Sequence, residues 1–253
     1  MKKITFAATA LAAGCAFASI TSSDVVGYQT YPLNEAGLCN VGAAFTPVNA
    51  TGKWTCDTKV FDTAATGGDT IYSLDTVVFD FNSYTFNGYS GEVSLGWTVY
   101  GMDYEKFEPK EYPPVASFEL EKAQVVYFQP SDTITSPTVS GRVDDIANAQ
   151  TVTIAKSLDI SEIVNPYPKA TTLADLATFC VAGDTLYVLD TYWFDFKTYV
   201  CLGDGSWSVY DFDEGGNLSD TTVNDLSTVV LPAGQGGYFQ PADDAGRTWT
   251  VTL

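Results

Sequence analysis

Apolar and polar side chains alternate along two stretches of this sequence, and alternation over a strand's length predicts β structure. The first stretch, GDTIYSLDTVVFDFNSY, begins at Gly68 and breaks briefly at Thr76 before a second alternating segment follows. The second, GDTLYVLDTYWFDFKTY, begins at Gly183 and breaks at Thr191. Because both stretches are rich in Tyr, Val, Ile and Leu, each of them predicts a β-hairpin.

The alternation also predicts which residues share a face of each hairpin. Phe79 and Phe81 fall on one face and Asp80 falls on the other. The second hairpin repeats this arrangement at Phe194, Asp195 and Phe196. An Asp between two Phe residues most often marks the solvent side of a half-buried strand. We therefore expect the shared Phe positions to serve core packing.

Two further blocks recur after each hairpin, in the same order. GWTVYGMD from Gly96 matches SWSVYDFD from Ser206, and LEKAQVVYFQP from Leu120 matches LPAGQGGYFQP from Leu231. The copies differ in length only between the blocks, where the first copy has the additional loop SGEVS. Three blocks repeated in one order indicate the internal duplication of one module. The predicted modules are residues 19–145 and 146–253.

The remaining local signals also favour β structure. VVYFQP and GGYFQP predict short strands that end at a proline, which cannot donate a hydrogen bond to a sheet. TVSGRV and TWTVTL predict closing strands. The one helical signal is TTLADLATF, where Thr171 or Thr172 could cap a short helix. The predicted fold is all-β, with two tandem sandwich-like modules and at most a short helix in each.

Residues 1–18 have the layout of a secretory signal peptide, with a positive end, a short apolar run and small residues before Ser19. The run is too short to span a bilayer, and no later segment is apolar for long enough to be a transmembrane segment. LAAGC, which ends at Cys15, resembles a lipobox with Ala12 in place of the usual Leu, so a lipid anchor at Cys15 is the alternative. Either interpretation predicts a secreted, periplasmic or outer-surface protein.

The composition agrees with export. The formal net charge is −19, so phosphate backbones and anionic lipid headgroups would repel the chain, and we do not expect it to bind nucleic acid. Apolar residues make up 45% of the sequence, which is enough to build a sizeable core.

The cysteines suggest disulfide bonds. Four remain beyond the leader, namely Cys39, Cys56, Cys180 and Cys201. An even number of cysteines in an exported chain predicts disulfides. The repeat favours bonds within each half, because the first copy lacks the second pair as a unit and has Ala65 and Phe86 in those places. Free buried thiols are the alternative.

Three motifs follow one another in the second half, IVNPYPKATTLADL, GDTLYVLD and LPAGQGGYFQP. Together they resemble a module found in secreted and surface proteins of Gram-negative bacteria, which carries an NP(Y/F)P segment, an aromatic hairpin and a PxGxG(F/Y) strand. Here Leu189 stands in place of the usual Trp, and the first half has EKAQ instead of the PAGQG turn. The resemblance implies a non-catalytic accessory or surface domain.

The sequence contains no histidine, which excludes Ser-His-Asp and Cys-His catalysis and histidine-ligated zinc. A carboxylate pair of the glycosidase type is a remote alternative, with Asp80 and Asp195 as its candidates. An active site would not normally recur in both copies of a small repeat, so we predict no catalytic residues and no enzyme.

An exposed aromatic platform is a better candidate site. TYWFDF places Trp193 on the same face as Asp195, and the first copy has Val78 at the corresponding position. Exported β modules often bind sugars by stacking them on aromatic rings, while carboxylates accept hydrogen bonds from the hydroxyls. The predicted ligand-binding residues are therefore Tyr192, Trp193 and Asp195. A Trp covered by the other module or by a partner subunit is the alternative.

Calcium is the one cofactor that the sequence suggests. DFDEGGNLSD gathers oxygen ligands in a Gly-rich loop, although its spacing fits no EF-hand. The candidate ligands are Asp211, Asp213 and Asp220, and a solvated acidic loop is the alternative.

These observations predict an exported, non-catalytic structural, adhesive or cell-surface protein, with a carbohydrate-binding module as the alternative. Its partners would be a cell-envelope component, a second copy of the chain or an extracellular glycan, bound through sheet edges or aromatic patches. Any local function should lie where the copies differ, at Trp193, at SGEVS and at DYEKFEPKEYPPV from Asp103.

Overall fold

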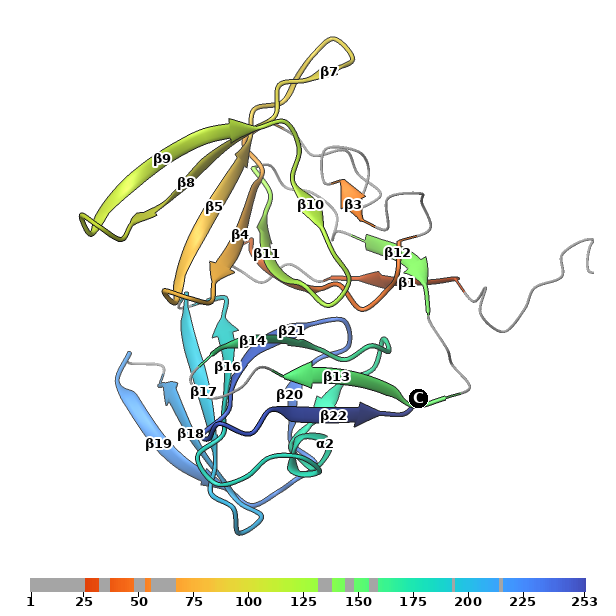
Figure 1. Cartoon of the computed structure of the whole chain (residues 1–253), viewed down its shortest axis with the longest axis vertical. Coiled ribbons are helices and arrows are strands. Elements are labelled where there is room, and N and C mark those ends of the chain that lie inside the picture. The colour runs from red at the N-terminus through yellow and green to blue at the C-terminus, as the bar shows by residue number, and fades with distance from the viewer. Residues whose placement is uncertain are drawn as a thin grey trace, which may run out of the picture.

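The computed structural model describes residues 26–31, 37–47, 53–55, 67–131, 138–143, 148–154, 159–192, 194–213 and 216–253. The predicted signal peptide, Cys15, Cys56 and Trp193 lie outside these ranges. The described chain is all-β, with antiparallel sheets and one short helix (Figure 1). No helix in these ranges is long and apolar enough to cross a membrane.

Each half of the chain contains one six-stranded antiparallel sheet. The first has the order β2 (Cys39–Gly42), β11 (Val125–Gln129), β4 (Thr70–Asp75), β5 (Asp80–Phe86), β8 (Trp97–Asp103) and β9 (Glu108–Val115). The second has the order β14 (Ser161–Val164), β21 (Gly236–Gln240), β16 (Thr185–Asp190), β17 (Asp195–Cys201), β18 (Trp207–Phe212) and β19 (Leu218–Val223). Both sheets therefore have the same topology, because strands at corresponding places in the two sheets also follow one another in the same order along the chain.

Two short ladders complete each half, again in matching order. In the first half β1 (Val26–Thr30) pairs with β12 (Thr138–Arg142), and β3 (Trp54–Thr55) pairs with β10 (Glu119–Leu120). In the second half β13 (Gln150–Ile154) pairs with β22 (Arg247–Val251), and β15 (Thr171–Thr172) pairs with β20 (Val229–Leu231). The predicted module boundary at 145/146 falls between β12 and β13, outside the described ranges.

One hairpin distinguishes the first half. β6 (Tyr89–Ser90) and β7 (Val93–Ser94) form a small antiparallel ladder that projects from the body of the protein (Figure 1). This hairpin contains the SGEVS loop, and no ladder in the described part of the second half corresponds to it. The length difference between the copies is thus accommodated at the periphery.

The helical signal is confirmed by α2 (Leu173–Ala177). Thr172 is its N-cap, because the Thr172 hydroxyl accepts a hydrogen bond from the Asp175 N–H while the Asp175 carboxylate accepts one from the Thr172 N–H. This reciprocal capping box starts the helix, and Leu173 and Leu176 bury its apolar face.

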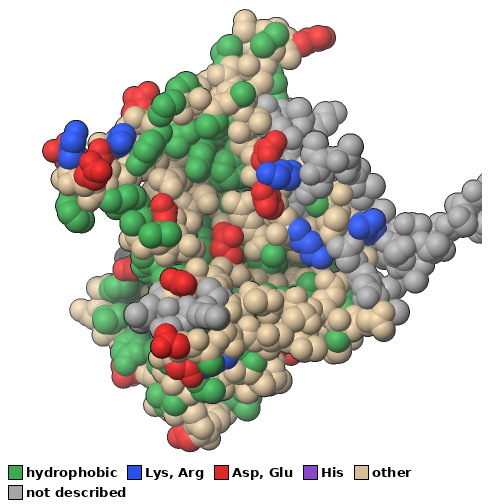
Figure 2. Space-filling view, viewed as in Figure 1, with side chains coloured by type: hydrophobic (Ala, Val, Ile, Leu, Met, Phe, Trp, Pro, Cys, Tyr) green, Lys and Arg blue, Asp and Glu red, His purple; other side chains and the backbone are tan. Residues whose placement is uncertain are grey.

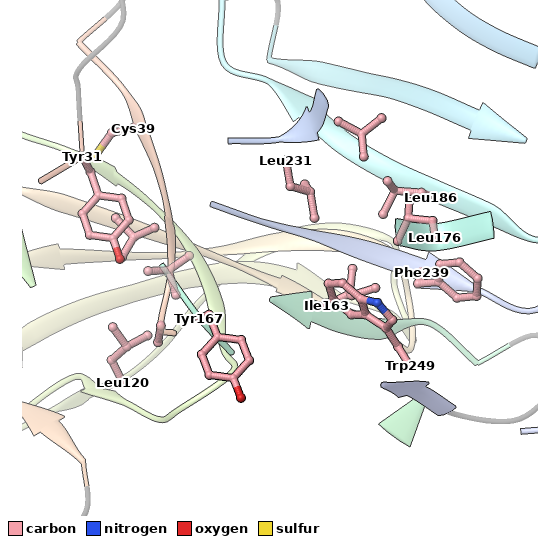
Figure 3. Close-up of a cluster of buried hydrophobic side chains, with 14 of the residues drawn as sticks. Tyr31, Cys39, Leu120, Ile163, Tyr167, Leu176, Leu186, Leu231, Phe239 and Trp249 are labelled. Carbon is pink, nitrogen blue, oxygen red and sulfur yellow. The ribbon is translucent and has the colours of Figure 1, made fainter. Parts of the chain in front are cut away.

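Side chains from both halves form one continuous core. Figure 3 shows part of it, with Tyr31, Cys39 and Leu120 from the first half and Ile163, Leu186, Phe239 and Trp249 from the second. Trp97 and Trp207, which occupy corresponding positions in the two halves, are both buried. The two halves therefore do not have separate hydrophobic interiors.

The predicted disulfides are wrong for the cysteines that the structure describes. Cys39, Cys180 and Cys201 are free thiols. Cys201 takes the place of Phe86, and each of these two buried residues lies opposite a buried tryptophan of the next strand. Cys180 packs against the same core cluster as Cys201. Cys180 and Cys201 therefore pack in the core without a bond between them.

The hairpin turns also differ from the prediction. Phe79 does not lie on a strand but ends a four-residue turn, which its N–H closes by donating to Asp75 O over 2.8 Å. Phe194 does the same with Asp190. Both Phe residues adopt a left-handed backbone conformation, with φ of 56° and 55°, and they are 37% and 46% exposed. The expectation that they pack in the core is therefore wrong.

These rings instead lie where the two halves meet, in a group we call the aromatic interface. Phe81 and Phe196 occupy corresponding positions and stack on each other with centroids 5.9 Å apart. The contacts around them are reciprocal, as expected for a two-fold arrangement. The reciprocal pairs are Phe79 with Tyr187, at 5.0 Å, and Phe194 with Tyr72, at 5.3 Å. In Figure 1 the β4–β5 turn lies against β16 and β17 accordingly.

Hydrogen bonds join the halves on the other side of this interface. The Gly42 N–H donates to Gly234 O over 2.7 Å. The Asn40 amide donates to Gly236 O over 2.7 Å and accepts from the Gly236 N–H over 3.0 Å. A Cβ atom on Gly42 would lie 2.8 Å from the facing backbone, so the close approach requires glycine.

Candidate functional site

The predicted ligand platform lies in the β16–β17 turn. Tyr192 is 60% exposed, and its N–H donates to Asp190 Oδ1 over 2.8 Å. Asp195 is exposed and its Oδ1 accepts a hydrogen bond from the Phe196 N–H over 2.7 Å. The structure thus exposes two of the three predicted residues, and the platform remains a prediction because Trp193 is not described.

The predicted calcium ligands do not come together. Asp211 forms an ion pair with Lys197, and Asp220 accepts a hydrogen bond from the Ser208 hydroxyl. Asp211 pairs with Ser219 across β18 and β19, and these two side chains share one face of the sheet. Asp220 follows Ser219 and therefore points to the opposite face. Asp213 Oδ1 accepts from the Asn217 N–H over 2.8 Å. Within the described ranges no three acidic or cysteine side chains form a metal-binding group.

The first half carries an open pocket on its sheet. Phe81 of β5 faces the aromatic interface, and the next residue, Asn82, points to the other face, where the pocket lies. The pocket has a volume of about 330 Å³. We call it the tyrosine groove and define it by Asp75, Asn82, Tyr84, Val99, Tyr104, Tyr112, Pro113 and Val115. Figure 2 shows hydrophobic side chains gathered over β5, β8 and β9 in this region.

Strand register aligns the centre of the groove. Tyr84 pairs with Val99 across β5 and β8, and Val99 pairs with Tyr112 across β8 and β9. Just beyond Tyr112 the register shifts at Pro113 and Pro114, and such a bulge bends the strand that contains it. Proline is tolerated here because β9 is an edge strand. The result is a row of side chains on a curved sheet.

Three contacts fix the outer part of the groove. The Tyr112 hydroxyl donates to Met102 O over 2.7 Å. Lys110 Nζ lies 4.9 Å from the centroid of the Tyr112 ring, a distance suited to a cation–π contact. Lys110 Nζ is also 3.4 Å from the Asp103 carboxylate. Tyr112 is therefore held by its hydroxyl and its ring before any ligand arrives.

Burial and nearby carboxylates raise the pKa values of two tyrosines in the groove. Burial, and then the charge of Asp75, raise the pKa of Tyr84. Burial, followed by the charges of Asp75 and Asp80, raises the pKa of Tyr104. Both hydroxyls therefore stay protonated at neutral pH and can donate hydrogen bonds.

The second half fills the same place with an ion pair. Lys197 takes the position of Asn82, and Asp211 takes that of Gly101. Lys197 Nζ lies 5.9 Å from the centroid of the Tyr199 ring and pairs with Asp211. Tyr199, which corresponds to the groove tyrosine of β5, is only 6% exposed. The same sheet face is therefore open in one half and closed in the other.

A second pocket, of about 230 Å³, lies between the halves and is lined by Lys122, Gln150 and Glu162 among others. Glu162 is largely buried, and burial raises its pKa to about 7, although the hydrogen bond that its Oε1 accepts from the Val125 N–H over 3.1 Å opposes the rise. Sequence reasoning missed this residue, because its partner Val125 belongs to the other half and is distant in the sequence. The tyrosine groove had a signal, since the 103–115 stretch was one place where the copies differ.

Comparison of the chain with family models, with curated proteins and with solved structures finds no match in any of the three.

Proposed function

We propose that this chain is an exported, non-catalytic adhesive surface protein that arose by duplication of one sandwich-like β module. The matching strand order of the two halves and the reciprocal contacts of the aromatic interface support the duplication. The leader-like residues 1–18 and the resemblance to surface modules support the export.

The chemistry of the chain favours binding over catalysis. Without histidine, a thiol nucleophile would have to be activated in another way, and burial instead raises the pKa of Cys39 to about 12. Burial also raises the pKa of Cys180 and of Cys201. Such thiols stay protonated and unreactive at neutral pH.

One observation carries the adhesive function, namely that the tyrosine groove is open in the first half while an ion pair closes the same face of the second. A duplicated scaffold needs no such difference for packing. The second half then serves as a rigid support that shares its core with the half that binds. The partner would be a component of the cell envelope or an extracellular glycan.

Two experiments test this proposal: cell fractionation of the tagged protein and an adhesion assay with isolated envelopes. We expect the tagged protein in the envelope or medium and the purified protein on isolated envelopes. Tyr104→Ala should reduce retention. Tyr100→Ala should not, because Tyr100, although it is exposed and follows the groove residue Val99 in β8, lies on the other face of the sheet. A cytoplasmic protein, or equal retention of both variants, would contradict the proposal.

A further inference from the structure

The tyrosine groove combines aromatic rings with hydrogen-bonding groups that have no internal role. Within the described part of the chain, no residue forms a hydrogen bond to the Asn82 amide or to the hydroxyls of Tyr84 and Tyr104. Aromatic side chains with a few convergent polar groups are the usual lining of a site for small ligands. A volume of about 330 Å³ is within the range of such sites.

The size of the row suits a sugar chain. Tyr84 and Tyr112 lie two strands apart in register, which is roughly 9–10 Å at the usual strand spacing. This is about the length of a disaccharide. The Tyr104 side chain comes from the β8–β9 turn and lines the same groove. A pyranose ring has an apolar face that can lie on such rings and hydroxyls that can bond to amide and carboxylate groups at its edge.

The charges around the groove select among glycans. Acidic residues outnumber the two lysines, Lys106 and Lys110, along the strands and turns that form its walls. The acidic residues are Asp75, Asp80, Asp103, Glu105 and Glu108. Glu111 pairs with Tyr100 and faces the other side of the sheet. One of the two lysines already pairs with Asp103. A uronic or sulfated glycan would be repelled here, whereas a protonated amine would be attracted by the carboxylates and by the faces of the tyrosines.

We propose that the tyrosine groove binds a neutral or amine-bearing polysaccharide, such as a glucan or a glucosamine polymer, and rejects acidic ones. This inference rests on the proposed adhesive function and names the ligand class of the same site. The closed second half serves as a natural reference, because its Lys197–Asp211 ion pair occupies the place that the sugar would need.

The experiment uses the full chain in affinity electrophoresis through gels that contain a neutral glucan, a chitosan or an alginate. We expect retardation by the glucan, by the chitosan or by both, and none by the alginate. Tyr104→Ala should weaken the retardation about fivefold to tenfold, as loss of one aromatic contact would. Tyr100→Ala, on the opposite sheet face, is the matched control and should leave it unchanged.

A double variant, Asn82→Lys with Gly101→Asp, tests the location by copying the ion pair of the second half. A Cβ on Gly101 would lie 2.0 Å from Asn82 Oδ1, so the two changes must be made together. We expect this variant to fold and to lose binding, and Tyr104→Ala gives the same readout if it does not fold. Preference for alginate would overturn the ligand class, and full binding by Tyr104→Ala would overturn the location. Adhesion to envelopes without binding to any of the three polymers would overturn this inference and leave the adhesive function standing.

Discussion

Titration of a single residue, Glu162, should make the stability of the protein depend on pH. Its pKa is raised by burial from 4.5 to about 7 in the folded state. A raised pKa means that the folded state prefers the protonated carboxyl group. The stability that this group contributes is therefore fully present below pH 4.5 and is lost as the pH rises through about 7.

Replacing Glu162 with Gln should remove this dependence, because a neutral amide can still accept the hydrogen bond from the Val125 N–H. We expect Glu162→Gln to match the parent protein at about pH 5 and to exceed its free energy of unfolding by about 1–3 kcal/mol at about pH 8. Urea denaturation at both pH values measures the difference. Glu105→Gln, at an exposed position, is the control, and a variant that gains nothing at the higher pH would contradict the assignment.

The buried carboxylate of Asp184 is stabilised by an ion pair with Arg247. The carboxylate is fully buried, and its Oδ2 lies 3.2 Å from Arg247 Nε. In the first half the corresponding Asp69 accepts hydrogen bonds from the Ser131 N–H and hydroxyl.

Arg247→Met should therefore destabilise the protein by about 3 kcal/mol, because it leaves a buried carboxylate without its partner charge. The double variant Arg247→Met with Asp184→Asn should recover part of the loss, since it removes the uncompensated charge. Thermal or urea unfolding measures both. A double variant less stable than Arg247→Met would show that Asp184 does not depend on the ion pair.

At the scale of elements, the period of the side chains predicted the strands, and a local capping motif predicted the helix. β4, β5, β16 and β17 follow the alternating blocks, and Thr172 caps α2 through a bond between neighbours in the sequence. The predicted positions of the hairpin turns were wrong, because the alternating pattern was extended through residues that belong to the turn. Asp75 Oδ1 accepts a hydrogen bond from the Val77 N–H, and this local bond extends the turn to Phe79.

The left-handed conformation of Phe79 tests what the turn is for. Asn adopts this conformation more readily than Phe, so local backbone preference favours Phe79→Asn. The variant loses the ring contacts with Tyr187 and Phe196, each at 5.0 Å. We expect a net destabilisation of about 1–2 kcal/mol in urea unfolding, because the contacts outweigh the strain. A more stable variant would show that the aromatic interface adds little here.

The site was less predictable than the strands. Position along the chain singled out the 103–115 stretch, but Tyr104 and Tyr112 join Tyr84 only through the register of β5, β8 and β9 and the shift at Pro113. The arrangement of the proposed calcium ligands was unpredictable for the same reason, since the register places Asp211 and Asp220 on opposite faces. Register depends on pairing across the sheet, and a single sequence does not reveal it.

The whole molecule resembles a dimer within one chain. The aromatic interface is reciprocal, and a smaller buried cluster beside it contains Leu74, Tyr127, Leu189 and Tyr238 from corresponding strands of both halves. A face that is complementary to its own counterpart can also pair with a second copy of itself.

The second half produced alone, as residues 146–253, should therefore form a homodimer. Its unpaired face would expose Tyr187, Phe196 and Tyr238, and pairing two such faces restores contacts equivalent to those in the full chain. Light scattering should give twice the mass of the half at micromolar concentration. Phe196→Asp should give a monomer or an unfolded chain, because it places a charge at the centre of the pairing face. A folded monomer of the unmodified half would contradict the prediction that this face pairs with a second copy of itself.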